Sequence, residues 1–355
     1  LFLNEIKFFN LKNKLICITG TNGKSTVAKM IAMHLNSKPL ANFGNLVLDN
    51  IPSKRNEKLI LELSSFQLDY TNAIKPNIAV ITNIDKDHLH HHGTYKNYVD
   101  SKLKISGFQT EDDYLILNYN DKKLRKNFFK TNKTKAKIIW VSEKNILKNG
   151  IYINKNLIID NYFDKKNIAL KNNSFFDLSH NKLNAALSYA VLRSLNYKTN
   201  RIINSLNSFK GLPHRLELIG RINNIDFFND SKATNVAATC SALDSFKNVI
   251  LIAGGSKKGE SFNALKKYAK KIQAVFLYGE TAHDISKSLD IVEVNVVCKN
   301  LKDSLYKAFA FNQKSKSLHP ILLSPASASF DFYENYQKRG DDFKNIFKEI
   351  NREVA

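Results

Sequence analysis

Residues 15–35 have the sequence LICITGTNGKSTVAKMIAMHL. The apolar run at residues 14–19 predicts a buried strand, and apolar residues at helical spacing over 27–35 predict a helix. Between them, a glycine-containing segment can point backbone N–H groups at phosphate oxygens, and the dipole of the following helix favours a bound anion. The sequence therefore predicts a phosphate-binding loop between a strand and a helix.

Two side chains of this loop have specific predicted roles. Lys24 would reach the β- and γ-phosphates of a nucleotide, and the Ser25 hydroxyl would bind Mg²⁺. The strict form of the motif requires glycine at position 18, where the chain has Ile18, so the loop is a shortened variant. The alternative interpretation is a structural turn that contains a Gly-Lys pair by chance. Such a turn would not need to lie between a strand and a helix, as this loop is predicted to do. The predicted nucleotide-binding residues of the loop are Gly20, Thr21, Asn22, Gly23, Lys24, Ser25 and Thr26.

Continuous apolar runs separated by helical patterns predict a mainly parallel sheet that helices cover on both faces. In the first part of the chain the expected strands are residues 14–19, 59–63, 78–84, 114–118 and 138–141, and a helix over 182–195 closes the series. The segment GLPHR, residues 211–215, indicates a linker. A second doubly wound series follows, with strands at 225–228, 249–253, 274–277, 292–297 and 321–323 and helices at 262–271 and 301–311.

The predicted fold class is therefore α/β with two domains. A P-loop-type domain with a mainly parallel sheet is expected over residues 1–211, followed by a second, Rossmann-like α/β domain over residues 212–355. A chain of 355 residues is long enough to form two hydrophobic cores. The Lys- and Asn-rich stretch 122–137 is expected to be an exposed surface segment.

The composition is that of a globular protein, with 43% hydrophobic and 24% charged residues. No run of about 18 apolar residues is present, so no membrane span is predicted. The three widely spaced cysteines match no metal or redox spacing and fit a reducing cytoplasm. The net charge of +22 would suit a nucleic-acid-binding protein, but the lysines are scattered along the chain, so we expect no nucleic-acid partner. A basic rim would also suit anionic phosphate substrates.

Three polar residues lie at or just beyond predicted strand ends. Glu62 lies within the apolar strand LILEL, His88 follows the strand 78–84, and Lys102 lies on an expected helix. Because the carboxyl ends of parallel strands meet at one edge of a sheet, Glu62 and His88 can converge beside the triphosphate and help to bind Mg²⁺. Taken alone, Glu62 would fit an edge strand and Lys102 a solvated surface. The histidines at 90–92 suggest loose metal binding, but no ligand pair at a zinc spacing supports a dedicated transition-metal site.

Nine segments occur along the chain in one order: GTNGKST, LELSSFQL, TNIDKDHLHHHG, SKLKI, SHNKLNAAL, GLPHRLE, NDSKATN, LIAGGSKKG and LLSPASASFDFYENYQKRGDDF. This series closely resembles the D-glutamate-adding members of the Mur ligase family, in their central and C-terminal domains, over essentially the whole chain. The phosphate loop alone would fit any Mur ligase or a folylpolyglutamate synthase, whereas LELSSFQL, GLPHR with NDSKATN, and SPASAS are more specific. The family carries a further N-terminal domain for the UDP part of its substrate, and the resemblance implies that this domain is missing before Leu1.

The resemblance also implies roles for individual residues. Lys24, Lys102 and His88 would be catalytic, and Ser25, Glu62, His88 and Lys102 would hold two Mg²⁺ ions, with Lys102 carbamylated. Carbamylation needs a neutral amine, a state that burial or cationic neighbours favour. Nucleotide contacts beyond the loop would come from Asn181, Asn184, Arg215 and Asp230. The residues implied in binding the other substrates are Asn45, Ser64, Lys232, Thr234, Lys258, Ser329, Phe330 and Tyr336.

The activity implied by the resemblance is ATP-dependent ligation by a cytoplasmic, monomeric enzyme of peptidoglycan precursor synthesis. UDP-N-acetylmuramoyl-L-alanine would be activated as an acyl phosphate, which D-glutamate would then attack. Another Mur-type or folylpolyglutamate-type ligase is the nearest alternative, although the Asp-Asn-Pro-Arg motif of the meso-diaminopimelate-adding enzyme is absent. A nucleic-acid-dependent P-loop motor and a non-catalytic ATP-binding remnant are the alternatives from other classes.

Overall fold

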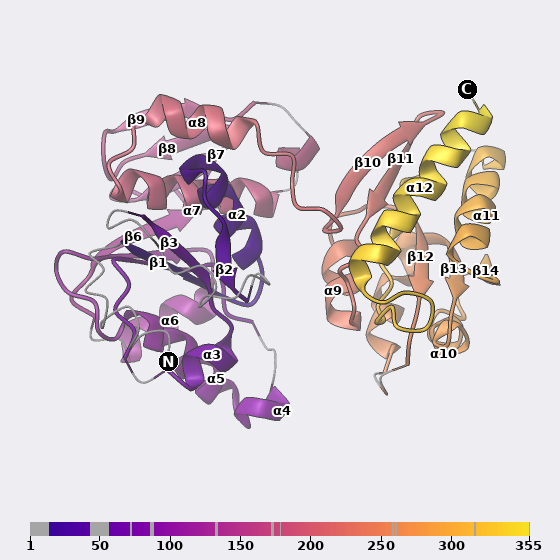
Figure 1. Cartoon of the computed structure of the whole chain (residues 1–355), viewed down its shortest axis with the longest axis horizontal. Coiled ribbons are helices and arrows are strands. Elements are labelled where there is room, and N and C mark those ends of the chain that lie inside the picture. Colours follow the sequence, from indigo (N-terminus) through magenta and orange to yellow (C-terminus); the bar gives the residue numbers. More distant parts are fainter. Residues whose placement is uncertain are drawn as a thin grey trace. The chain divides into compact units, whose positions relative to one another are not determined.

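The computed structural model describes residues 14–42, 57–71, 73–85, 89–131, 134–171, 174–177, 179–257, 259, 261–315 and 317–354. The chain divides into two compact units, Leu1–Lys210 and Gly211–Ala355. Each unit has its own sheet with helices packed against it (Figure 1). The predicted α/β class with two sheet domains is confirmed.

The sheet of the first unit contains nine strands among the described residues, in the order β2-β3-β1-β4-β5-β6-β7-β8-β9. Strands β1 to β7 are parallel to one another in the sheet. Strands β7, β8 and β9 form antiparallel hairpins at one edge. Their bounds are β1 Leu15–Thr19, β2 Pro39–Ala41, β3 Leu59–Glu62, β4 Ile78–Ile81, β5 Tyr114–Asn118, β6 Lys137–Ser142, β7 Ile151–Asn154, β8 Leu157–Asp160 and β9 Lys166–Ala169.

Helices lie on both faces of this sheet, with α2, α7 and α8 on one side and α3, α5 and α6 on the other (Figure 1). Alternate residues of β1 explain the arrangement, because Leu15 and Cys17 join a core with Tyr98, Val99 and other residues of the second helix group. The helices are α2 Lys24–Leu35, α3 Ser65–Asp69, α4 Leu89–His92, α5 Tyr95–Leu103, α6 Lys122–Thr131, α7 Ser179–Ser194 and α8 Thr199–Asn207, with 3₁₀ turns η2 Lys104–Ser106 and η3 Ser174–Asp177.

The second unit has a six-stranded sheet in the order β10-β11-β15-β12-β13-β14, parallel except for the edge strand β10. One core packs α9, η4 and α10 on one face of the sheet, and another packs α11 and α12 on the other. The strands are β10 Glu217–Ile222, β11 Ile225–Asn229, β12 Val249–Gly254, β13 Ile272–Tyr278, β14 Asn295–Val297 and β15 Ile321–Leu323. The helices are α9 Val236–Leu243, η4 Asn263–Lys271, α10 Ala282–Ser288, α11 Leu301–Lys314 and α12 Tyr336–Val354.

Some local expectations were wrong, and one was incomplete. The described lysines of the segment 122–137 are exposed as expected, but much of the segment is the helix α6, whose Leu124 and Phe128 are buried. The segment 262–271 contains the 3₁₀ helix η4 where an α-helix was expected. The first unit does not close after residue 195, because α8 follows and buries Ile202 and Leu206.

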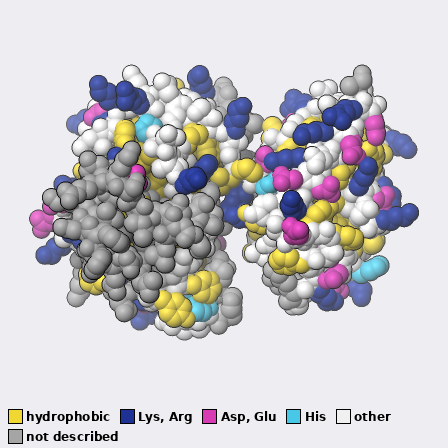
Figure 2. Space-filling model, in the orientation of Figure 1, with side chains coloured by type: hydrophobic (Ala, Val, Ile, Leu, Met, Phe, Trp, Pro, Cys, Tyr) yellow, Lys and Arg dark blue, Asp and Glu magenta, His cyan; other side chains and the backbone are white. Residues whose placement is uncertain are grey.

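The distribution of surface charge and the apolarity of the helices can be compared with the expectations for nucleic-acid-binding and membrane proteins. Figure 2 shows Lys and Arg side chains dispersed over the visible face among acidic and hydrophobic ones, not gathered in one tract. Among the described residues, none of the helices combines the length and apolarity needed to cross a membrane.

Candidate active site

The phosphate loop follows β1, the strand at which the order of strands in the sheet reverses: β2 and β3 lie on one side of it and β4 on the other. Strand β1 pairs with β3 on one side and with β4 on the other. In open α/β sheets such a switch point leaves a crevice at the carboxyl ends of the strands, and ligands bind there. The strand and the helix that flank this predicted loop lie where the sequence predicted them, because β1 is encoded by an apolar run and α2 by helical spacing.

Two glycines of the loop have left-handed backbone conformations. Gly20 has φ 146° and Gly23 has φ 84°. A Cβ atom at Gly20 would collide with Thr82 Oγ1, and one at Gly23 would lie 2.7 Å from Asn184 Oδ1. The loop therefore needs glycine at both positions, for its backbone angles and for its close neighbours.

The residues that follow β4 hold the loop in place. Thr82 Oγ1 donates a hydrogen bond to the Asn22 carbonyl (2.6 Å), and Asn83 Oδ1 accepts one from the Asn22 N–H (2.9 Å). The Thr21 N–H donates to the Asn83 carbonyl at 2.9 Å. Sequence reasoning assigned no role to Thr82 or Asn83, although they open the segment TNIDKDHLHHHG. Their position directly after a buried strand was the available signal.

Two lysine ammonium groups converge on one carbonyl of the loop. Lys24 Nζ donates to the Gly20 and Thr21 carbonyls, both at 2.8 Å, and Lys102 Nζ donates to the Gly20 carbonyl at 3.0 Å. Lys102 is 2% exposed, and its Nζ lies 4.8 Å from the centre of the Tyr98 ring. The Lys24 ammonium beside a loop of this shape matches the charge of a nucleotide triphosphate, and the buried Lys102 lies next to it.

A buried carboxylate at the end of β3 fits the predicted magnesium role. Glu62 is 2% exposed and stands opposite Ile18 in the β1–β3 register. Its Oε1 accepts a hydrogen bond from Asn42 Nδ2 (3.1 Å), while its Oε2 is buried with no partner among the described residues. An unsatisfied buried carboxylate oxygen is costly, and a hard cation such as Mg²⁺ would satisfy it. Ser25, 5% exposed at the start of α2, is the second described candidate ligand.

The other predicted residues of the first unit are placed as follows. Asn181 and Asn184 lie one turn apart on α7 and are both nearly buried. Asn181 Nδ2 donates to the Phe175 carbonyl (2.9 Å), whereas the side chain of Asn184 lies against Gly23 of the loop. Ser64 is the N-cap of α3, in a reciprocal capping box with Gln67. Thr26 lies in the first turn of α2. The predicted residues Asn45 and His88 lie outside the described residues.

In the second unit, Asp230 follows β11 in a buried position. Its Oδ1 accepts a hydrogen bond from the Leu216 N–H (3.1 Å), and its Oδ2 accepts one from Ser324 Oγ (2.8 Å). Burial raises the pKa of Asp230 to about 7, although these hydrogen bonds and the nearby charges of Arg215 and Arg339 act in the opposite direction. The carboxyl group is therefore poised to gain or lose a proton near neutral pH.

Of the predicted amino-acid-binding residues, Lys232 and Thr234 follow β11, and Ser329 and Phe330 follow β15. Lys232 Nζ lies 5.1 Å from the centre of the Tyr336 ring, a cation–π contact. The Thr234 N–H donates to the Lys232 carbonyl at 2.8 Å. Ser329 is 2% exposed, whereas the neighbouring Phe330 is 69% exposed. Lys258 lies outside the described residues.

Arg339 connects these two loops, and sequence reasoning did not find it. The side chain is completely buried. Its Nε donates to Ser231 Oγ (3.0 Å), and its Nη2 donates to the carbonyls of Ser231 (2.8 Å) and Ser327 (3.1 Å). A fourth bond runs from Nη1 to the Ala328 carbonyl at 3.0 Å. The guanidinium group thus fixes the loop that carries Lys232 against the loop that carries Ser329. The segment YQKRG contained the residue but gave no sign that its charge is buried.

A pH-dependent stability is expected from Asp230. Because its pKa rises from 3.8 to about 7 on folding, the folded state holds the proton more tightly than the unfolded chain. The corresponding stabilisation is complete below the unfolded pKa and is lost as the pH rises through about 7. A shift of this size corresponds to at most about 4 kcal/mol. Asp230→Asn should abolish this loss, as measured by denaturant unfolding across pH 4–8. Asp290→Asn, at an exposed position, is the control. Parallel pH profiles for Asp230→Asn and the wild type would contradict the assignment.

Comparisons with known proteins give a consistent result. Residues 18–192 match the family model described as the Mur ligase middle domain, and residues 214–319 match the Mur ligase, glutamate ligase domain. The UDP-N-acetylmuramoylalanine–D-glutamate ligase of Rickettsia bellii is 35% identical over 98% of this chain and 79% of its own length. The enzyme of the same name from Streptococcus pyogenes serotype M5 is 37% identical over 97% of this chain and 76% of its own.

Solved structures share the fold at low sequence identity. MurF from Acinetobacter baumannii aligns with a TM-score of 0.69 at 16% identity, over 96% of this chain and 78% of its own. MurF ligase from Thermotoga maritima, in complex with ADP, aligns with a TM-score of 0.65 at 17% identity, over 99% of this chain and 83% of its own.

Proposed function

The chain belongs to the Mur ligase family and is an ATP-dependent ligase, and from this premise we propose that it joins D-glutamate to UDP-N-acetylmuramoyl-L-alanine. The observation that carries the choice of substrates is the 35–37% identity, along nearly the whole chain, to ligases named for this reaction. The product is a precursor of peptidoglycan.

The first step of the proposed reaction activates a carboxylate. An oxygen of the substrate carboxylate attacks the γ-phosphorus of ATP, so that ADP leaves and an acyl phosphate forms. Lys24 and the backbone of the loop bind the phosphates, and their positive charge offsets the repulsion between two anionic reactants. Asn181, Asn184, Arg215 and Asp230 are the proposed contacts to the rest of the nucleotide, and Asn45 and Ser64 are proposed to lie toward the acyl end of the substrate.

The proposed metal site combines Ser25, Glu62 and His88 for one Mg²⁺ ion and a carbamylated Lys102 for a second. Bound magnesium would neutralise charge on the transferred phosphoryl group. The buried and unpartnered Glu62 Oε2 supports this role. Carbamylation converts the Lys102 amine and CO₂ into a carbamate with release of one proton. The modified nitrogen keeps one N–H, so its hydrogen bond to the Gly20 carbonyl can persist.

The second step forms the amide. The amine of D-glutamate attacks the acyl carbon, phosphate leaves, and the nitrogen loses a proton. D-Glutamate carries two carboxylates, which need cationic and hydroxyl partners. Lys232, Lys258, Thr234 and Ser329 provide such groups, and Phe330 and Tyr336 complete the proposed set. Arg339 is a positioning residue here, because it holds both loops without itself being exposed.

A monomeric state and a cytoplasmic location are part of this proposal. The three cysteines are free and buried, and they support a reducing compartment. Size-exclusion chromatography with light scattering tests the monomer directly.

The proposed reaction is tested by measuring amide formation from UDP-N-acetylmuramoyl-L-alanine with a panel of amino acids. We expect ligation of D-glutamate with one ADP and one phosphate released per amide. L-Glutamate, L-alanine and meso-diaminopimelate should give little product. Preferential ligation of another member of the panel would overturn the choice of amino acid while leaving the ligase class in place.

Selectivity for D-glutamate is expected to depend on Lys258. Losing one charge-assisted hydrogen bond typically costs about 1.5–3 kcal/mol, so Lys258→Ala should raise the D-glutamate KM by roughly 10- to 150-fold. The ATP KM should change far less. Lys257→Ala is a matched control, because Lys257 pairs with Asp284 at 2.9 Å on the surface. Equal increases in both KM values would argue that Lys258 does not contact the amino acid.

A further inference from the structure

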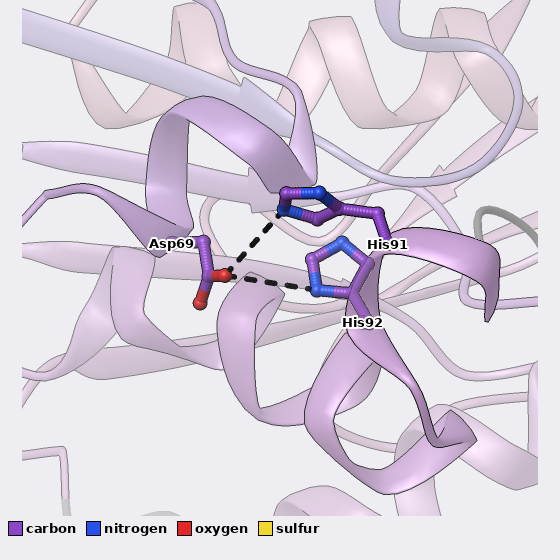
Figure 3. A group of neighbouring side chains, drawn as sticks. All are labelled: Asp69, His91 and His92. Carbon is purple, nitrogen blue, oxygen red and sulfur yellow. Dashed lines mark ion pairs between the residues drawn. The ribbon is translucent and has the colours of Figure 1, made fainter.

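Helices α3 and α4 bring three metal-binding side chains together outside the site described above. Asp69 Oδ2 lies 3.8 Å from His91 Nε2 and 3.9 Å from His92 Nδ1. One ligand atom from each residue lies within 4.8 Å of the other two. Figure 3 shows both imidazole rings turned toward the same carboxylate oxygen. We propose that Asp69, His91 and His92 form a binding site for a divalent transition metal ion, with Zn²⁺ the best fit.

The donor set selects the class of ion. Two imidazole nitrogens and one carboxylate oxygen are the protein ligands of many zinc sites in which water takes the fourth position. Mg²⁺ prefers oxygen ligands in an octahedral arrangement and would gain little from two histidines. The site therefore differs in chemistry from the one proposed at Ser25 and Glu62, and the two can hold different metals at the same time.

Two of the three distances between ligand atoms need only a small adjustment, and the third, between the two imidazole nitrogens, is within 4.8 Å. Tetrahedral bonds of about 2.0–2.2 Å to the metal place neighbouring ligand atoms roughly 3.3–3.6 Å apart. The two carboxylate–imidazole distances, 3.8 and 3.9 Å, exceed that range only slightly. The Asp69 and His91 side chains are 40% and 27% exposed, so an ion can reach them from solvent and small rotations can close the site.

Surrounding contacts already orient the ligands. His92 is 1% exposed at its side chain, and its Nε2 lies 3.0 Å from Ser65 Oγ. If Nδ1 binds the metal, Nε2 carries the hydrogen and donates it to Ser65, which is the usual arrangement around a metal-bound histidine. Lys104 Nζ lies 3.4 Å from Asp69 Oδ1, which leaves Oδ2 facing the two histidines.

The histidine run alone does not explain this arrangement. Asp69 ends α3, while His91 and His92 belong to α4, and only the fold places the carboxylate between the rings. The expectation that the run offers no dedicated site rested on ligand spacing within the sequence. A carboxylate from a distant helix supplies the ligand that this spacing lacked.

The site adjoins the element that carries Lys102. The His92 ring centre lies 5.4 Å from that of Tyr98 on α5, and Tyr98 Oη lies 2.8 Å from Thr21 Oγ1 of the phosphate loop. A metal that joins α3 to α4 would therefore stiffen the packing beneath the loop. Zn²⁺ should raise the Tm of the nucleotide-free protein, because a ligand that binds only the folded state stabilises it.

The test is calorimetric titration of the full chain with Zn²⁺ in excess Mg²⁺, comparing the wild type with Asp69→Asn and His91→Ala. Both substitutions are at exposed positions, so the fold should tolerate them. Loss of an outer-shell partner typically lowers metal affinity by roughly 10- to 100-fold. Loss of a direct ligand should lower the zinc affinity of this site by at least as much. Any zinc bound at the nucleotide site should remain, so the number of tightly bound ions should fall by one.

Two control variants define the result. Asp112→Asn removes another exposed carboxylate from the same unit, and His283→Ala removes an exposed histidine from the other unit. Neither should change zinc binding. All four variants should keep wild-type ATP turnover without zinc, which shows that they are folded. Wild-type zinc affinity in Asp69→Asn would overturn the proposal and leave only loose binding by the histidine run. Wild-type affinity in His91→Ala would also overturn it.

Discussion

Replacing Lys24 with alanine should lower ATP turnover by about 10³-fold or more, because the lysine supplies charge at the point where the phosphoryl group is transferred. Lys24 Nζ already lies within the loop, 2.8 Å from the carbonyls of Gly20 and Thr21. Phosphate oxygens would replace these carbonyls as its partners. Turnover is measured as ADP and phosphate release in the complete ligation assay.

The fold should survive this substitution. The buried residues of α2 include Val27, Met30 and Ile31, which remain in place, and alanine is a favourable helix former. The Tm of the variant should therefore stay close to that of the wild type. Lys29→Ala is the matched control, because Lys29 is an exposed lysine of the same helix. Wild-type phosphate release by Lys24→Ala would show that the loop is wrongly assigned.

Replacing Lys102 with alanine should also leave little activity, with a loss of at least about 10²-fold. Unlike Lys24→Ala, the Lys102→Ala variant should regain part of its activity when acetate, formate or propionate is added. The substitution removes a buried side chain between the Gly20 carbonyl and the Tyr98 ring. A short carboxylic acid can enter that space and replace the carboxylate of the proposed carbamate. Recovery of ligation at rising acid concentration is the measurement.

The carbamate itself can be detected independently of activity. Wild-type protein equilibrated with ¹³C-bicarbonate should show a carbamate resonance that is absent from Lys102→Ala. Lys96→Ala, at an exposed position on the same helix, should keep both the resonance and the activity. An inactive Lys102→Ala that no acid rescues, together with an unlabelled wild type, would limit Lys102 to the direct role of a buried cation.

Local sequence patterns were sufficient for most of the parallel strands and for the loop between β1 and α2. The bounds of β5 and β15 agree with the predicted 114–118 and 321–323, because a short continuous apolar run has few alternatives to a buried parallel strand. The edge hairpins β7 to β9 were not predicted. Their strands have only four residues each and mix polar with apolar side chains, so no clear period stands out.

The sequence by itself determined the family and the strand–loop–helix element that carries the predicted phosphate loop, because backbone conformation and the order of these elements are encoded within a few residues. Tertiary structure decided which distant side chains meet. The Lys102 ammonium reaches the Gly20 carbonyl, and Arg339 joins two loops, through contacts across many residues of chain. The Asp69–His91–His92 trio is formed in the same way. Such contacts depend on strand order and helix packing, which place side chains together without leaving any regular spacing in the sequence.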